Sequence, residues 1–448
     1  MKITRWYRWT AIAAAIAVLI VALRTCGIGQ KIAAPEPVEQ IEPELTLQTV
    51  TLEQPDENGS LLWRLKAKSV NYSPNNQRAK LKELEGEFFQ AGETIYTVVA
   101  DEGEVRQNGE TLYLTGNLVA KGAENELTLE SDRLKWQPKQ DRLIMGDFED
   151  DALSTSGSEN SDVDDTDAGD GNRADGALAV ETRPLVNPSS DEPTANRFPT
   201  ENSDKPAVKG FSPQIETTAQ VVTVINQEDR VDLSGGVIAK SKETPWLTFE
   251  SDSLVWFTEL EQVEAQQLLK VEQYASKDYR VVSDRILGAK GEVNLTDSIV
   301  TLDESVQLTS LSQSSAQPLK AESKSAVWDV ENQTVALDNP VKLEQPEQKI
   351  TASANQARLD LGQEVIYLTG NVQANGEEKG SQLNADSLTW RTGSQDVEAE
   401  GNVSYQQAVD PEVSMTGERA VGNIEQGTVV VTDSRSGEVV IEIVPNGF

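Results

Sequence analysis

The stretch LYLTGNL at residues 112–118, together with ESDRLKW at residues 130–136, decides the fold, because both parts recur along this chain of 448 residues. The later copies read LSGGV at 233–237 with ESDSLVW at 250–256, and LTGNV at 368–372 with NADSLTW at 384–390. In the three copies the glycine and the tryptophan are 20, 21 and 20 residues apart, which fits one strand, a turn, a second strand and the start of a third. The repeat predicts a stacked β-structure that serves as a scaffold.

Alternation of apolar and polar residues extends outward from these copies. Trp63 and Leu65 are predicted to face one way while Arg64 and Lys66 face the other, as in half-buried strands. This pattern covers residues 45–148 and, after an interruption, residues 211–448. The last two strands are expected at 428–432 and 438–444, as a C-terminal hairpin.

Composition supports a β-scaffold and argues against common catalytic chemistry. Only 5% of the residues are aromatic and the chain holds 30 Gly and 18 Pro, so an aliphatic, strand-built core is expected. The chain contains no His, the usual general base and the commonest metal ligand. Familiar nucleophile, zinc and nucleotide motifs are missing too. We therefore predict that the chain is not an enzyme, with no catalytic residue, cofactor or metal site.

The N-terminus has the pattern of a membrane anchor. Residues 9–23 are apolar apart from Thr10 and follow the basic residues Lys2, Arg5 and Arg8. This pattern predicts a cytoplasmic tail at 1–8, a transmembrane anchor at 9–25 and a Pro/Glu spacer at 26–44, with the remainder across the membrane. Because the apolar run is short, a cleaved signal peptide or lipidation at Cys26 remains an alternative. The net charge of −35 disfavours nucleic acid as a partner.

Residues 149–210 interrupt the strand pattern. They hold 15 acidic against 5 basic side chains and many Ser, Thr, Gly and Pro, so they are predicted to form a disordered acidic linker. The aspartates from Asp162 to Asp170 suggest a calcium loop, but an EF-hand that began at Asp162 would need Glu at its twelfth position, where Arg173 stands. A solvated linker is the interpretation that we adopt.

The sequence GSLLWRLKAKSVNY at 59–72, followed by the elements at 112–118 and 132–136, resembles the LptC family. Members of this family are membrane-anchored periplasmic components of the lipopolysaccharide export machine, and the order of tail, anchor, spacer and β-domain matches as well. Residues 211–448 resemble more loosely the LptA/OstA-like β-repeats of the same superfamily. The chain departs from the family in being more than twice the usual length and in carrying the acidic insert.

The resemblance implies an all-β fold: an open β-jellyroll of antiparallel strands, either one long or two tandem, behind a single transmembrane helix. It also implies a bridge subunit anchored in the inner membrane, with most of the chain in the periplasm. Such a subunit would accept lipopolysaccharide from an inner-membrane ABC transporter and pass it along an apolar groove toward an LptA-like bridge protein. Strand edges would join neighbouring subunits.

Two sets of residues are predicted to carry this function, although a filled sandwich core would use the first set equally well. The expected groove lining is Trp63, Leu65, Tyr72, Leu112, Leu114, Leu118, Leu127, Leu129, Leu134 and Trp136. The expected partner edge strand includes Val429, Val431, Val439 and Ile441.

The repeated glycines Gly116, Gly235 and Gly370 are open to two interpretations, a β-bulge or a contact with a ligand or partner. Two other function classes share some of these features. A membrane-anchored structural or adhesive β-solenoid would have the repeats and the anchor, but near-constant unit lengths and small residues between its coils. A polysaccharide hydrolase could use paired carboxylates, yet none stands in a recognisable motif.

Overall fold

The computed structural model describes residues 45–73, 78–106, 109–123, 126–149, 207–311, 317–409, 412–432 and 442–443. Most of these residues lie in strands, which confirms the predicted all-β class. The predicted tail, anchor and spacer and most of the predicted acidic linker are outside the described residues. Within the described ranges, no helix is long and apolar enough to cross a membrane. By their contacts, residues 45–448 form one unit.

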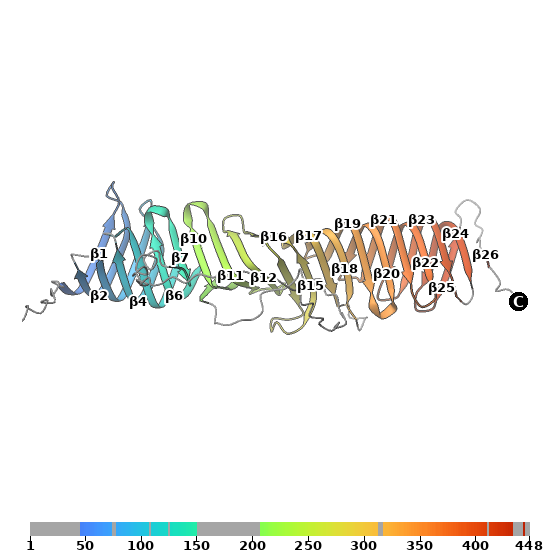
Figure 1. The fold of residues 1–448 in the computed structure, drawn as a ribbon, viewed down its shortest axis with the longest axis horizontal. Coiled ribbons are helices and arrows are strands. Elements are labelled where there is room, and N and C mark those ends of the chain that lie inside the picture. The colour runs from blue at the N-terminus through green and yellow to red at the C-terminus, as the bar shows by residue number, and fades with distance from the viewer. Residues whose placement is uncertain are drawn as a thin grey trace, which may run out of the picture. The chain divides into compact units, whose positions relative to one another are not determined.

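The strands form an antiparallel ladder from β1 to β25 that follows chain order except at two places, where β7 pairs with β10 and β13 with β16 (Figure 1). The first strands are β1 (Leu45–Pro55), β2 (Leu61–Ser73), β3 (Arg78–Gln90), β4 (Glu93–Arg106), β5 (Thr111–Gly122), β6 (Thr128–Gln137), β7 (Arg142–Gly146) and β8 (Val208–Phe211). Next come β9 (Ile215–Ala219), β10 (Val221–Ile225), β11 (Arg230–Ser241), β12 (Leu247–Phe257), β13 (Gln262–Ala265), β14 (Leu269–Tyr274), β15 (Val282–Gly288) and β16 (Lys290–Asn294). The last are β17 (Ile299–Ser310), β18 (Leu319–Asp329), β19 (Thr334–Gln345), β20 (Ile350–Asp360), β21 (Val365–Gly376), β22 (Ser381–Arg391), β23 (Asp396–Gln407), β24 (Val413–Asn423), β25 (Thr428–Thr432) and β26 (Glu442–Ile443). The antiparallel pairing differs from a parallel β-helix solenoid, in which successive coils stack in parallel.

The ladder of paired strands continues across the acidic insert. Strand β7 pairs with one half of β6 and β8 with the other half, so β7 and β8 are two pieces of one strand position. In the same way β10 and β9 pair with the two halves of β11, and β10 also pairs with β7. The insert therefore leaves and re-enters in the middle of a strand position. The sequence left open whether the chain builds one long structure or two, and the strand pairing is unbroken from β1 to β25.

Most strands bend at their midpoint, and this bend explains the repeated motif. In β21 the buried Leu368 and Val372 are four positions apart and flank Gly370, whereas in β22 the buried Ala385 and Leu388 are three positions apart. The register shifts here by one residue, which is a β-bulge, and Gly370 has a φ of +78°. In a straight strand only residues an even number apart share a face, so Ala385 and Leu388 could not both point inward. Because the strand turns a corner between them, both side chains face the interior.

The two halves of the bent strands form two layers that face each other. We call the layer with Trp63 and Phe88 layer A and the layer with Leu112 and Trp136 layer B. The rings of Phe88 and Trp136 stack with centroids 5.2 Å apart and an interplanar angle of 4°, although β3 and β6 are three strands apart along the ladder. The indole Nε1 of Trp63 donates a hydrogen bond of 3.0 Å to the carbonyl of Gly109 in the β4–β5 turn. These contacts are possible only across the space between the layers.

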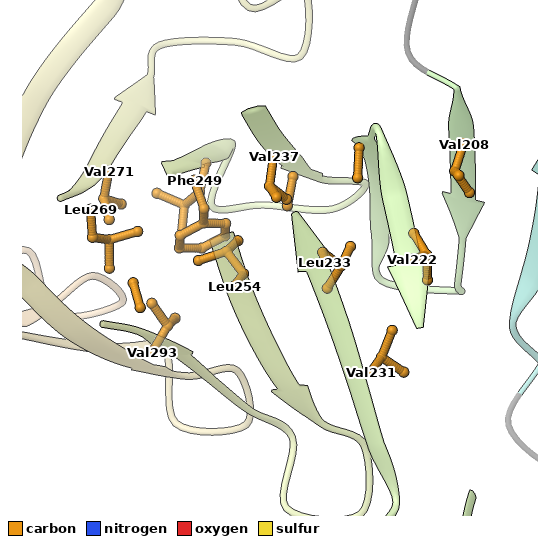
Figure 2. Close-up of a cluster of buried hydrophobic side chains, with 14 of the residues drawn as sticks. Val208, Val222, Val231, Leu233, Val237, Phe249, Leu254, Leu269, Val271 and Val293 are labelled. Carbon is orange, nitrogen blue, oxygen red and sulfur yellow. The ribbon is translucent and has the colours of Figure 1, made fainter. Parts of the chain in front are cut away.

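The apolar core fills this space along the ladder. Figure 2 shows the part of the core that follows the acidic insert, where Val237 and Phe249 come from layer A and Leu233 and Leu254 from layer B. All four side chains are buried. Because burial of such side chains is the main favourable term in folding, the contact between the layers stabilises the bent strands.

The C-terminal strands differ from the predicted hairpin. Strand β25 pairs with residues 419–423 of β24, and β26 pairs with Val413 and Ser414 of the same strand. Both are antiparallel to β24, so they run in the same direction and are successive pieces of one strand position. Strands of a hairpin must run in opposite directions, and the hairpin prediction is therefore wrong.

Candidate functional site

The structure buries nine of the ten residues that were predicted to line a groove. They belong to β2, β5, β6 and the turn before β6, and are exposed by at most 4%: Trp63, Leu65, Leu112, Leu114, Leu118, Leu127, Leu129, Leu134 and Trp136. Tyr72 is the exception, with 38% of its surface exposed. It lies next to the end of β2, opposite Leu45 at the start of β1, where the ladder begins. The structure therefore does not place Tyr72 in the interior.

In this N-terminal part the buried side chains are packed against one another. The stack of Phe88 on Trp136 spans the space between the layers, and both residues are at most 1% exposed. Access for a ligand would require these two rings to separate.

The interior opens at two other places: in the middle of the ladder, where a cavity of about 180 Å³ is lined by Leu247, Phe249 and Val293 among others, and near the C-terminal end. A cavity of about 190 Å³ lies between the layers from β20 to β25. Its apolar lining includes Ile350, Ala352 and Leu383 from layer A, and Leu388, Trp390 and Val397 from layer B. Among the residues predicted from sequence for groove or edge, Val429 lines this cavity.

Small side chains explain why there is space at this position. The lining contains Ala352, Ala374, Ala399, Ala420 and Gly422. The N-terminal strands bury alanines as well, but beside them they carry large inward side chains such as Phe88, Tyr96 and Trp136. Facing side chains this short cannot meet across the interior, so the layers leave a gap. The run of alanines at inward positions of β20–β24 was the signal that could have located the cavity from the sequence.

Two polar atoms in the cavity lining have no hydrogen-bond partner. They are the indole Nε1 of Trp390, whose residue is 3% exposed, and the amide Oε1 of Gln348. Gln348 belongs to the turn η5 (Pro346–Gln348) of layer A, and Trp390 to β22 in layer B. A third polar side chain is paired, because the hydroxyl of Tyr405 donates a 2.9 Å hydrogen bond to Gln407 Oε1. Burial raises the pKa of Tyr405.

A positively charged side chain lies at the opening of this cavity. Lys379, in the β21–β22 turn of layer A, is exposed and lines the opening. Its Nζ lies beside Gly427 in the β24–β25 turn of layer B, since a Cβ added to Gly427 would come within 2.5 Å of it. The opening is therefore on the side of the ladder where the turns of the two layers approach each other.

A second hollow lies on the outer face of layer B in the N-terminal part and is lined by charged side chains, among them Lys80, Lys82 and Glu102. The charges of its wall partly neutralise one another: Arg106 Nε is 2.7 Å from Glu104 Oε1, and the guanidinium of Arg106 lies 4.1 Å from the ring centre of Tyr113. This hollow offers a mixed surface, in which charged side chains lie beside apolar residues such as Leu81 and Phe148.

Two buried carboxyl groups lie on layer A in the middle of the ladder. Glu272 accepts hydrogen bonds from Tyr274 and Arg285 at 2.7 and 2.6 Å. Burial alone would raise the pKa of Glu272, but these hydrogen bonds lower it on balance, while burial raises the pKa of Tyr274 to about 12. Asp284 faces the interior, where it accepts a 2.6 Å hydrogen bond from Ser310, and burial raises its pKa. No cluster of metal-ligating side chains occurs in the part of the chain that the structure describes.

The repeated glycines are structural. Gly116, Gly235 and Gly370 all have φ near +80° and stand at register shifts between neighbouring strands. A Cβ on Gly370 would lie 2.7 Å from Asn355 Nδ2. The β-bulge interpretation is therefore confirmed.

The predicted partner edge strand is described only in part. Strand β25 has one paired neighbour, β24, among the described strands, and Val431 within it is fully buried opposite Ala420. Val430 faces outward and is 52% exposed. Val439 and Ile441 lie outside the described residues. At the other end of the ladder, β1 likewise has one paired neighbour, β2, within the described ranges.

Comparison with known proteins returned one family. The model described as "Lipopolysaccharide-assembly, LptC-related" matches residues 10–144 and 344–435. The first segment contains the predicted groove residues, and the second contains the C-terminal cavity. Among solved structures, LptH of Pseudomonas aeruginosa, the LptA-homologous periplasmic component of the lipopolysaccharide transport device, is 14% identical. The match has a TM-score of 0.25 and covers 29% of this chain and 96% of LptH. No curated protein sequence matches the chain.

Proposed function

Because this chain belongs to the LptC-related family of lipopolysaccharide-assembly proteins, we propose that it is a bridge subunit of the lipopolysaccharide export machine. Residues 9–25 would hold it in the inner membrane, with the β-ladder in the periplasm. The subunit would accept lipopolysaccharide from an inner-membrane ABC transporter and pass it toward the outer membrane.

The observation that carries this proposal is the pair of facing layers with an apolar interior, which widens into a cavity at the C-terminal end. We interpret this arrangement as one long open β-jellyroll. Each methylene moved from water into such an interior contributes about 0.8 kcal/mol, so acyl chains would be held between the layers while the sugars stay outside. The chain would perform no chemistry, and the energy for transport would come from ATP hydrolysed by the transporter.

Photocrosslinking in cells tests the path of the lipid. A photoreactive residue at Leu383, which lines the cavity, should form an adduct with lipopolysaccharide that depends on ATP hydrolysis by the transporter. The matched control is Gln382, an exposed residue next to it that points away from the interior. Equal adducts at both positions, or none at Leu383 in well-expressed protein, would refute transport between the layers.

The exposed ends of the ladder would join the partner proteins. An unpaired strand edge offers a row of backbone donors and acceptors to another chain, and a charged or covered edge would prevent this. We expect a photoreactive residue at Val430 in β25 to crosslink to an LptA-like bridge protein. Val421, which pairs with Val430 but lies one strand further inside, is the control and should crosslink much less. A stronger crosslink at Val421 would argue against docking at this edge.

A further inference from the structure

We propose that the C-terminal cavity is a holding site for an acyl chain that is attached to a sugar through an amide, with Trp390 donating to the amide carbonyl and Gln348 accepting from the amide N–H. The inference rests on the proposed function, and it names the chemical linkage between acyl chain and sugar that the C-terminal cavity would select.

The unpaired atoms carry the argument. A buried indole N–H or amide oxygen without a partner costs free energy, and buried polar atoms in native proteins are usually satisfied. Here one donor, Trp390 Nε1, and one acceptor, Gln348 Oε1, line the same apolar cavity from opposite layers. A group that satisfies both must itself accept and donate. An amide does so, whereas an ester only accepts and an ether is a weak acceptor.

The size and the mouth of the cavity fit the rest of such a ligand. With about 190 Å³, the cavity exceeds an engineered apolar cavity of about 150 Å³ that binds benzene. It therefore has room for a segment of an acyl chain. Lys379, which lines the opening beside Glu378, places a positive charge where a sugar headgroup would meet solvent, and this cation can pair with an anionic substituent.

Other buried tryptophans provide a control. Trp328 in β18 is also fully buried with an unpaired Nε1, but it is not part of the lining of the C-terminal cavity. An unpaired indole by itself is therefore not enough to mark the site. The assignment to Trp390 depends on the cavity and on Gln348.

The test uses the full chain in digitonin, labelled with ¹⁵N at the tryptophan indoles, and two probes that each carry a twelve-carbon chain on a glucose-type sugar. N-dodecanoyl glucosamine carries the amide, and dodecyl glucoside carries an ether-type oxygen. We expect the amide probe to bind about tenfold more tightly than the glucoside, because one buried donor gains a hydrogen-bond partner. The amide probe should also shift the Trp390 indole resonance, which is identified by its absence from the spectrum of Trp390→Phe. Trp390→Phe and Gln348→Leu should lose this preference for the amide probe over the glucoside, and Trp328→Phe should retain it.

Equal affinity of the wild-type chain for both probes, or an unchanged preference in Trp390→Phe, would overturn the inference. If the preference is absent but the lipopolysaccharide adduct at Leu383 persists, the linkage assignment fails and the proposed function stands. If the adduct at Leu383 is absent too, the proposed function fails with it.

Discussion

The stack of Phe88 on Trp136 should couple the two layers energetically. Phe88→Ala and Trp136→Ala each remove a fully buried ring and should lower the free energy of opening of β2–β7 by about 3–5 kcal/mol. Because the rings stack at 5.2 Å, the double variant should lose less than the sum by about 1 kcal/mol. In a flat sheet, β3 and β6 would be separated by about 14 Å and would not couple.

Hydrogen exchange read by mass spectrometry on peptides from β2–β7 measures this local opening free energy. It suits a long ladder, in which global unfolding need not be two-state. Peptides from β20–β24 serve as an internal control and should change little. If the changes in opening free energy caused by the two substitutions add to within about 0.5 kcal/mol in the double variant, the contact between the layers is refuted. A positive result would also imply that lipid can pass this point only when the rings separate.

Three further predictions concern stability. The raised pKa of Asp284 means that the folded chain binds this proton more tightly than the unfolded chain, so stability is lost as pH rises through the folded pKa. Asp284→Asn should therefore stabilise the chain at pH 7 by about 1 kcal/mol and little at pH 4 in thermal unfolding, and an equal effect at both pH values would contradict this. The lowered pKa of Glu272 has the opposite sign, because its stabilisation is present above the usual carboxyl pKa and is lost as pH falls through the folded pKa. Glu272→Gln should thus destabilise by about 2 kcal/mol at pH 7, and the difference should shrink in acid; a constant difference would show that the charge on Glu272 is not the cause. Gly370→Ala should cost more than Gly236→Ala in chemical denaturation. Both glycines have positive φ, which costs about 1 kcal/mol for alanine, but only at Gly370 would the new Cβ meet a neighbour, and equal costs would count against the close contact.

Much of the fold followed from local pattern. The alternation around Leu112 and Leu114 predicted inward side chains, and both are buried. The repeated glycines marked the bends, because a bulge needs a residue that tolerates positive φ. The absence of His argued early against catalysis, and the order of the segments pointed to the family whose model matches the chain.

The candidate site was only partly predictable. Sequence placed the groove at Trp63–Trp136, as a set of large apolar residues, but large residues fill an interior and small ones leave it open. The C-terminal cavity lies at β20–β25, where alanines from different strands face each other across the two layers. Alternation also could not show that Tyr72 is exposed, because exposure depends on whether another strand follows beyond β1.

The amino-acid sequence by itself determined the strands, their inward faces and the positions of the bends, since these follow from residue periodicity and backbone preference within a few residues. Tertiary structure alone decided that the ladder continues across the acidic insert, that the last two strands share one position, and where the two layers leave space. Those features depend on which strand lies beside or opposite another, and on the summed volume of side chains from separate strands, which no local pattern contains.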